Sequence, residues 1–511
     1  MNVSAFLWLL ALTPTVLADW REDADFFLLQ EYVGAPLLDG TGLSVAQTEA
    51  GTNYMPNSAS SIFSGVSAIN NITNSNSAIS SHATNVGNRF YGSGLSLTPN
   101  ITTVNVRSAD DFINNFIGGT EQVGSSSDIV MSHAYIFNPG ADDPNTVVDE
   151  NAQDIASING LVIRLDYFSQ TSNITNVVGL NNGSGTSVPP GWGASYNSIT
   201  VGRVNGEHSR GGTPSDFESP GRLKPDLVVN ETATSWSTGA ISSSAALLHQ
   251  KAAEQNNIDA THIDTIKASL LTGATKDANW SQTPTQPLDL IYGAGGVNIF
   301  NSYRITEQNE SAVGNVFHRG WARDATSTTQ TRTYTFTTPN LGEKAFLSAA
   351  LIWQREVTEV IIDNGEEDSF VYHYEDLPNL KLELLDSANN ILQESDSPLD
   401  NVEHIWSPML ETNTTYSLRV SSSSGVSDFS LAWRVDNDVR INLDVTASDT
   451  EANILISNLV PNISYTVQRS TDLITWTDIG NFLPLTVNDS YTDSSLPTGG
   501  RVFYRLRYFL P

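Results

Sequence analysis

Ser235 combines a nucleophilic side chain with a helical setting. The stretch NETATSWSTGAISSSAALLHQKAAE passes from small residues into a helical pattern that continues to about Ala253. Ser235 would therefore stand at the amino terminus of a helix, where free N–H groups and the positive end of the helix dipole favour a developing oxyanion. This setting suits a nucleophile, and an ordinary Ser-rich first turn explains the pattern equally well.

An imidazole and a carboxylate occur in settings that could serve such a nucleophile. Ser80 and Ser81 precede His82 in SSHATNVGNRFYG and could cap a helix that starts near Ala83. Glu49 ends the apolar run of VAQTEAG, which is typical of a strand that delivers one side chain to the edge of a sheet. A partly buried helix-cap histidine is the alternative interpretation of His82.

An amide donor is the fourth candidate. The run VVGLNNGSG predicts a buried strand that leads into Asn181, Asn182 and Gly183. An asparagine at such a strand end can donate its side-chain amide to an oxyanion. Asparagine is equally common there as a turn former, so this candidate depends on its surroundings.

The elements that must position these residues predict an α/β domain. From about Glu31 to Tyr303, apolar runs alternate with helical patterns: LVIRLDYF indicates a helix, ITNVVGL a buried strand, and IDTIKASLLTGA an amphipathic helix. The last of these would place Ile263, Ile266, Leu270 and Leu271 on one apolar face. Alternation of this kind predicts a parallel sheet with helices on its faces.

After Tyr303 helical periodicity disappears and short alternating segments predict two all-β domains. TRTYTFTTP, KAFLSAALIW, LKLELLDS, TTYSLRV and FSLAWRV favour an antiparallel β-sandwich. RINLDV, ANILISNL, SYTVQRS, TWTDIG, SYTDSS and RVFYRLRYF favour a small terminal β domain. We predict domains at residues 19–303, 304–436 and 437–511.

The amino terminus and the charge predict an exported protein. MNVSAFLWLLALTPTVLA, residues 1–18, resembles a secretory signal peptide cut before Asp19, and we expect an extracellular or periplasmic protein without a membrane anchor. The net charge of -31 repels nucleic acid and anionic lipid. Because the chain has no cysteine, disulfides and thiolate metal sites are excluded.

Taken in order, the candidate motifs resemble those of the subtilisin-like serine peptidases, the subtilases. VAQTEAG resembles the acid motif at Glu49, HATNVGN the histidine motif at His82, and TATSW the serine motif at Ser235. GLNNG resembles the motif of the oxyanion asparagine, which falls on Asn181. Further similar segments lie between about Gly40 and Tyr303: DIVMSHA, NSITVGRVNGEHSRGGTPSDFESPGRLKPDLVV and YGAGGVN.

The resemblance implies a three-layer α/β catalytic domain and a secreted serine endopeptidase that hydrolyses protein or peptide substrates. In such an enzyme Ser235 attacks the carbonyl, His82 transfers its proton, and the acid orients the imidazole. The resemblance also implies that Met131 and Ser132 line the substrate cleft. It implies no required cofactor.

Several positions depart from the subtilase pattern. The acid is Glu49 where the family has Asp, which shifts the carboxylate by about 1.5 Å on an unchanged backbone, and a misplacement of about 1 Å can cost about 100-fold in rate. Asp39 is the substitute acid to consider. Ala83 and Ala233 replace glycines and Gly239 replaces a proline. Ala233 is disfavoured if its φ is positive.

The carboxyl-terminal segments resemble the β-sandwich modules, of the pre-peptidase C-terminal kind, that follow many secreted subtilases, and then a small fibronectin-like module. Such modules imply docking to substrate, a cell surface or a polysaccharide. A catalytically inactive subtilase-fold protein for adhesion or binding is therefore the alternative function, and it would use aromatic side chains such as Trp476 and Tyr504. Core packing is the plainer explanation of both aromatics.

The acidic stretch DNGEED, residues 363–368, offers the oxygen ligands that calcium takes. It lacks the EF-hand pattern, so a solvated loop is the alternative.

Overall fold

The computed structural model describes residues 19–509 except 35–36, 74–76, 119–120, 138–149, 219, 364, 366–367, 438, 440, 449, 473–474 and 498–500. The predicted signal peptide, residues 1–18, lies outside the described residues. The helices are α1 (Trp20–Asp23), α2 (Phe26–Val33), α3 (Ser81–Phe90), α4 (Ala109–Asp111), α5 (Glu150–Ser172), α6 (Thr234–Ala253), α7 (Ile263–Gly273) and α8 (Ile299–Thr306), with the helical turns η1 (Ser61–Phe63), η2 (Phe112–Ile117) and η3 (Trp192–Ala194). None of the described helices is both long and apolar enough to cross a membrane.

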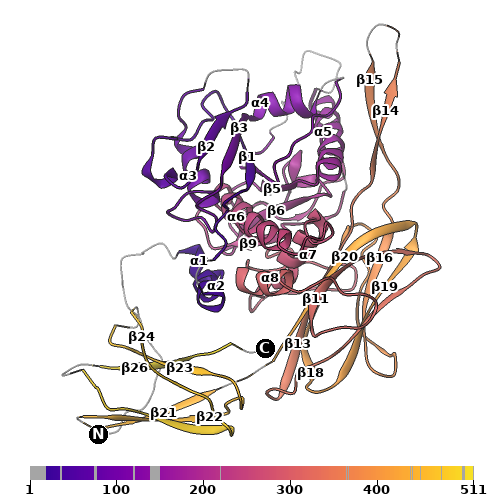
Figure 1. Cartoon of the computed structure of the whole chain (residues 1–511). Coiled ribbons are helices and arrows are strands. Elements are labelled where there is room, and N and C mark those ends of the chain that lie inside the picture. Colours follow the sequence, from indigo (N-terminus) through magenta and orange to yellow (C-terminus); the bar gives the residue numbers. More distant parts are fainter. Residues whose placement is uncertain are drawn as a thin grey trace.

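A parallel sheet forms the centre of the first part of the chain (Figure 1). Over the described residues its order is β2-β3-β1-β4-β5-β6-β9, and all neighbouring pairs are parallel. The strands are β1 (Ser44–Glu49), β2 (Ala68–Asn71), β3 (Thr103–Ser108), β4 (Val130–His133), β5 (Thr175–Gly179), β6 (Ser198–Arg203) and β9 (Leu227–Val229), and a short ribbon joins β7 (Gly211–Gly212) to β8 (Leu223–Lys224).

Helices cover both faces of this sheet, which gives three layers. Successive strand residues point to opposite faces, and accordingly Val45 belongs to the apolar cluster that contains α6, whereas Ala46 belongs to the cluster that contains α5. Val177 and Val178 divide in the same way. The predicted helix LVIRLDYF lies within α5, and the predicted strand ITNVVGL contains β5, whose residues are all buried.

The prediction of an amphipathic helix for IDTIKASLLTGA is wrong in one respect. The helix exists as α7, but all of its residues are buried. Its polar face is covered by the following β-sandwich: Ser348 Oγ and Arg434 Nε donate to the carbonyl of Thr272 at 2.8 and 2.9 Å, and Thr265 bonds Ser430. The sandwich therefore makes buried polar contacts with α7, beside apolar ones in which Ile352 and Ala432 join the core of the α/β part.

Two facing sheets follow, with orders β10-β12-β19-β16-β17 and β11-β20-β13-β18, and an apolar core lies between them. The segments predicted as strands from TRTYTFTTP to FSLAWRV all contain strands. The bounds are β10 (Gly314–Asn315), β11 (Arg319–Ser327), β12 (Arg332–Thr337), β13 (Lys344–Ile352), β16 (Asn379–Leu385), β17 (Ile391–Ser395), β18 (Val402–Glu411), β19 (Thr415–Ser424) and β20 (Val426–Asn437).

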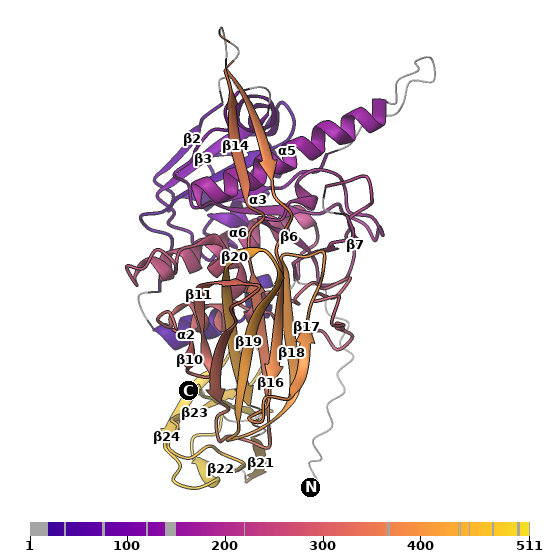
Figure 2. The same ribbon diagram turned by 90° about the vertical axis from the view of Figure 1, so that its right-hand side faces the viewer.

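A hairpin that the sequence patterns did not predict projects from the sandwich. It consists of β14 (Val357–Ile362) and β15 (Ser369–Tyr374), and it runs beside α5, as both views show (Figures 1 and 2). Tyr372 packs on Tyr167 of α5, with ring centroids 4.9 Å apart, and its hydroxyl accepts from the backbone N–H of Val123 at 2.8 Å. The hairpin thus adds to the contacts between the sandwich and the α/β part.

The carboxyl-terminal part has two three-stranded sheets, β21-β22-β25 and β24-β23-β26, around a small apolar core. Each of the six segments predicted as strands overlaps one: β21 (Asn442–Ala447), β22 (Ala452–Ser457), β23 (Tyr465–Ser470), β24 (Thr477–Phe482), β25 (Asn488–Asp493) and β26 (Phe503–Arg507). Trp476 lies 4.3 Å from the Arg505 guanidinium, and the hydroxyl of Tyr504 donates to Asp493 at 2.9 Å. Both aromatics are therefore engaged within the domain.

Candidate active site

Glu49 and His82 form a hydrogen-bonded pair. Glu49 ends β1 and is 2% exposed, whereas His82 is the second residue of α3 and its side chain is 43% exposed. The Oε2 atom of Glu49 lies 2.7 Å from Nδ1 of His82. The predicted cap places the histidine, because Ser80 Oγ accepts the backbone N–H of Ala83 at 3.1 Å and starts the helix there. A buried acid therefore holds one nitrogen of an accessible imidazole.

The second carboxylate oxygen of Glu49 is held by Gln47. Nε2 of Gln47 donates to Oε1 of Glu49 at 2.8 Å and also to the carbonyl of Ala83 at 3.0 Å. The buried hydroxyl of Tyr91 in turn donates to Oε1 of Gln47. These bonds fix the longer glutamate side chain and join β1 to α3. Sequence reasoning missed Gln47, although its position two residues before Glu49 on a strand places both side chains on one face.

The pair changes how readily His82 takes a proton. The hydrogen bond and then the negative charge of Glu49 raise the pKa of His82 above its usual 6.5, against a lowering by burial. In four other histidines burial outweighs the other effects and lowers the pKa. It falls to about 3 for His249 and to about 4 for His133, His208 and His262. His82 is thus distinguished from these by a close hydrogen bond to a carboxylate, at 2.7 Å, and by its exposure.

Ser235 lies in the first turn of α6, as the sequence predicts. It is half-buried, and its backbone N–H has no partner within the described part of the chain, as expected for a first-turn amide. The next residue, Trp236, has its ring 5.3 Å from the imidazole of His82. The amino terminus of α6 is therefore beside the Glu49–His82 pair, and α3 and α6 pack together.

Asn182, rather than its neighbour, contacts the helix that carries Ser235. Its Oδ1 accepts from the backbone N–H of Thr234 at 2.9 Å and lies 3.3 Å from the hydroxyl of the same residue. Since a backbone N–H can only donate, the facing atom is the oxygen and Nδ2 points elsewhere as a donor. The predicted oxyanion residue, Asn181, is exposed, and its backbone carbonyl accepts from Ser209 at 2.9 Å. The only sequence signal for Asn182 was that it directly follows Asn181 at the end of the predicted strand.

Two departures from the family pattern prove compatible with this geometry. Ala233 has φ of -148° and ψ of 151°, which is extended backbone open to any residue, so no strain arises there. Gly239 lies where α6 crosses α3: a Cβ at this position would be 2.6 Å from the carbonyl oxygen of Val86 and 3.0 Å from Cβ of Arg89. The glycine allows the close helix crossing that brings α3 and α6 together.

Met131 and Ser132 lie on β4 between β1 and β5, and both are buried, at 2% and 0% exposure. Met131 belongs to the apolar cluster on the α5 side of the sheet. Neither side chain is exposed in this structure, and the place of these residues in a substrate cleft stays a prediction. The next residue, His133, is also buried, with Thr48 and Asn176 as partners at 2.8 Å.

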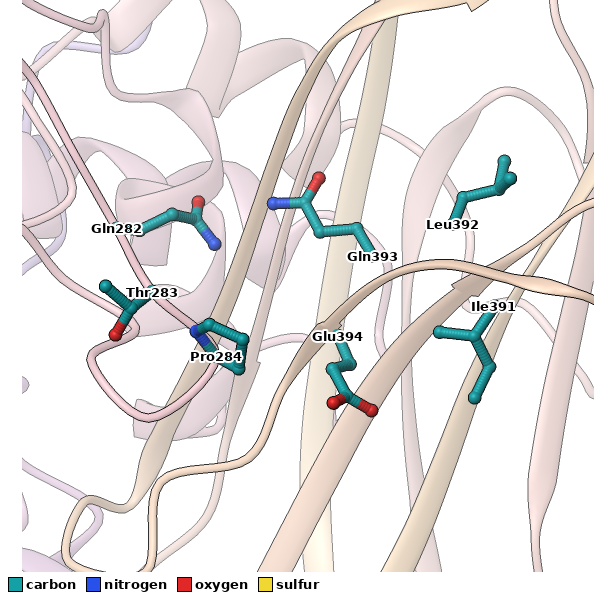
Figure 3. Close-up of a pocket in the computed structure, with 7 residues that line it drawn as sticks. All are labelled: Gln282, Thr283, Pro284, Ile391, Leu392, Gln393 and Glu394. Carbon is teal, nitrogen blue, oxygen red and sulfur yellow. The ribbon is translucent and has the colours of Figure 1, made fainter.

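The remaining candidates lie apart from this site or outside the described residues. Asp39 is engaged by Asn100 Nδ2 at 2.7 Å and by the N–H of Thr41 at 3.0 Å. The calcium prediction includes residues 364 and 366–367, which are not described, and no metal-binding group of three acids or histidines occurs among the described residues. A hollow of about 480 Å³ between the 282–284 loop and β17 contains none of the residues above (Figure 3).

Comparisons with known proteins give only distant matches to solved structures. No protein-family model and no curated protein matches the sequence. Among solved structures, tripeptidyl peptidase 2 matches at 9% identity with a TM-score of 0.24, covering 76% of this chain and 43% of its own. The pre-peptidase C-terminal domain of a Bacillus anthracis collagenase matches at 13% identity with a TM-score of 0.17, covering 25% of this chain and 98% of its own. Scores this low carry no argument, so function must be argued from the site.

Proposed function

We propose that this protein is a secreted serine endopeptidase that uses a Ser-His-Glu triad. The observation that carries the proposal is the 2.7 Å contact between buried Glu49 and His82, beside the amino terminus of the helix that bears Ser235. Glutamate in place of aspartate is accommodated because Gln47 fixes its free oxygen. In this proposal the carboxyl-terminal domains dock the enzyme to its protein substrate, to a cell surface or to polysaccharide.

The hydrogen-bond roles follow from the donors and acceptors available. An ionised carboxylate can only accept, so Nδ1 of His82 carries the proton toward Glu49 and Nε2 is left free as a base. Nε2 would take the proton of Ser235 as its hydroxyl attacks the peptide carbonyl, and would return it to the leaving amine. The imidazolium formed between these steps is stabilised by Glu49.

The developing oxyanion needs donors beside Ser235. One donor is the N–H of Ser235 at the start of α6, which has no partner among the described residues, and the helix dipole favours negative charge there. The sequence prediction assigns the second donor to Asn181. The contact of Asn182 with Thr234 makes its free Nδ2 a competing candidate for the same role.

The test is labelling of the full-length protein by a fluorophosphonate probe, together with hydrolysis of casein. We expect label on the wild type and none on Ser235→Ala, because only the hydroxyl can form the phosphonyl ester. Ser237→Ala is the matched control on the same helix, since its hydroxyl contacts the carbonyl of Ala233 at 3.4 Å. A folded wild type that takes no label would refute the proposal and favour the alternative, a non-catalytic binding protein.

The dependence on pH follows from the raised pKa of His82. As a base His82 must be neutral, so the rate of labelling should increase with pH and reach half its maximum above pH 6.5. A rate profile with its midpoint below pH 6.5 would contradict the proposed pairing.

The Glu49–His82 pair has the opposite pH dependence in its contribution to the stability of the fold. That contribution is complete below the unfolded pKa of His82, about 6.5, and is lost as pH rises through the folded pKa.

A further inference from the structure

Trp236 lies against His82, and the single hydrogen bond to Glu49 does not fully fix the orientation of the His82 ring. The hydrogen bond from Nδ1 to Glu49 fixes one edge of the His82 ring but still allows the ring to rotate about the axis of that bond. The Trp236 ring lies 5.3 Å from the imidazole at an interplanar angle of 35°. A flat aromatic neighbour at this distance restricts the plane of the imidazole.

Trp236 also contacts the arginine of an ion pair. The guanidinium of Arg89 lies 5.0 Å from the Trp236 ring. Arg89 binds Glu231 with two bonds, from Nε to Oε1 at 2.6 Å and from Nη2 to Oε2 at 3.1 Å. Both partners of this pair are largely buried, at 12% and 8% exposure, so the arrangement is better defined than a surface ion pair.

These contacts connect the two segments that carry the reacting groups. His82 and Arg89 are seven residues apart on α3, which places them on one side of the helix. Glu231 and Trp236 flank Ser235 in the sequence. Arg89, Glu231 and Trp236 therefore join α3 to the chain on both sides of the nucleophile, through contacts that do not involve Glu49.

We propose that Trp236 is a positioning residue that, anchored by Arg89 and Glu231, holds the imidazole plane of His82 in line with Ser235. This inference rests on the proposed function. It adds a role for the residue directly after the nucleophile, whose ring lies 5.3 Å from that of His82. The aromatic face also favours the imidazolium formed during the reaction, as a cation lying against an aromatic ring is attracted to it.

The test compares Trp236→Leu with Trp236→Phe in the full-length protein. The first readout is the NMR titration of the His82 ring without substrate. The second is the rate of fluorophosphonate labelling. Trp236→Leu should lower the pKa of His82 and slow labelling by about 100-fold, the loss typical of a displacement of about 1 Å. Trp236→Phe, which keeps an aromatic face, should recover most of both.

Trp476→Leu is the matched control, because it removes another Trp–Arg contact, with Arg505 at 4.3 Å, in the terminal domain. It should leave the titration of His82 unchanged. A Trp236→Leu protein in which His82 titrates and Ser235 labels as in the wild type would overturn the inference. Absence of label on the wild type would instead refute the proposed function, while the titrations would still decide whether Trp236 acts on His82.

Discussion

Replacing Glu49 by Gln should lower the rate of fluorophosphonate labelling and of casein hydrolysis by about 10⁴-fold, with little change in fold. The amide is the same size as the carboxylate, and its oxygen can still accept from Gln47. Its NH₂ group would donate to Nδ1 of His82, which forces the proton onto Nε2 and removes the base. Losing the correct tautomer in this way costs about 10⁴-fold in serine peptidases.

The shorter acid gives the complementary measurement. Glu49→Asp keeps the charge but withdraws the carboxylate from the 2.7 Å contact with His82. On an unchanged backbone the displacement is about one methylene, so we expect a loss of about 100-fold, smaller than that of Glu49→Gln. If Glu49→Gln reacts as fast as the wild type, Glu49 does not orient His82 and another group must be sought.

Replacing Arg355 by Leu should lower the free energy of unfolding by about 3–5 kcal/mol. Arg355 follows β13 in the sandwich and is 1% exposed. Its Nε donates to Asp166 of α5 at 2.8 Å, and Nη1 donates to Glu218 at 2.5 Å. Asp166 is fully buried, so loss of the arginine leaves an uncompensated charge between the sandwich and the α/β part. Urea unfolding would measure the change.

Two further variants isolate the buried charge as the cause. Arg332→Leu removes a pair with Asp324 in which both side chains are partly exposed, and it should cost less than about 1 kcal/mol. The double variant Arg355→Leu with Asp166→Asn should recover part of the loss, because the neutral amide needs no cation. If Arg355→Leu unfolds like the wild type, the ion pair does not hold the two parts together.

Much of the fold was predictable because local patterns specify local elements. The two-residue alternation predicted the strands of the sandwich and of the terminal part, and the apolar run ITNVVGL predicted β5. The failures occurred where a distant segment changes the surroundings. Nothing in IDTIKASLLTGA reveals that β13 and β20 cover its polar face, so α7 was predicted as amphipathic although it is buried throughout.

In the candidate site, too, the features set by local sequence were predictable and those set by distant segments were not. The cap at Ser80 and the helix that starts beside Ser235 are encoded within a few residues, and both were predicted. Neighbouring Asn181 and Asn182 are equivalent as sequence, and only the arrival of α6 beside their loop distinguishes them. Met131 and Ser132 likewise match a motif, yet burial between two strands removes their side chains from the surface.

By itself the sequence determined which chemical groups are present and which short elements carry them: an acid ending a strand, a histidine in the first turn of a helix, and a serine in the first turn of another. Only the tertiary structure decided that the extra methylene of Glu49 still reaches His82, that Gln47 holds the acid, and that Trp236 faces the imidazole. The physical reason is that hydrogen-bond and ring contacts depend on ångström distances between segments far apart in the chain. Residue types and spacing leave those distances open.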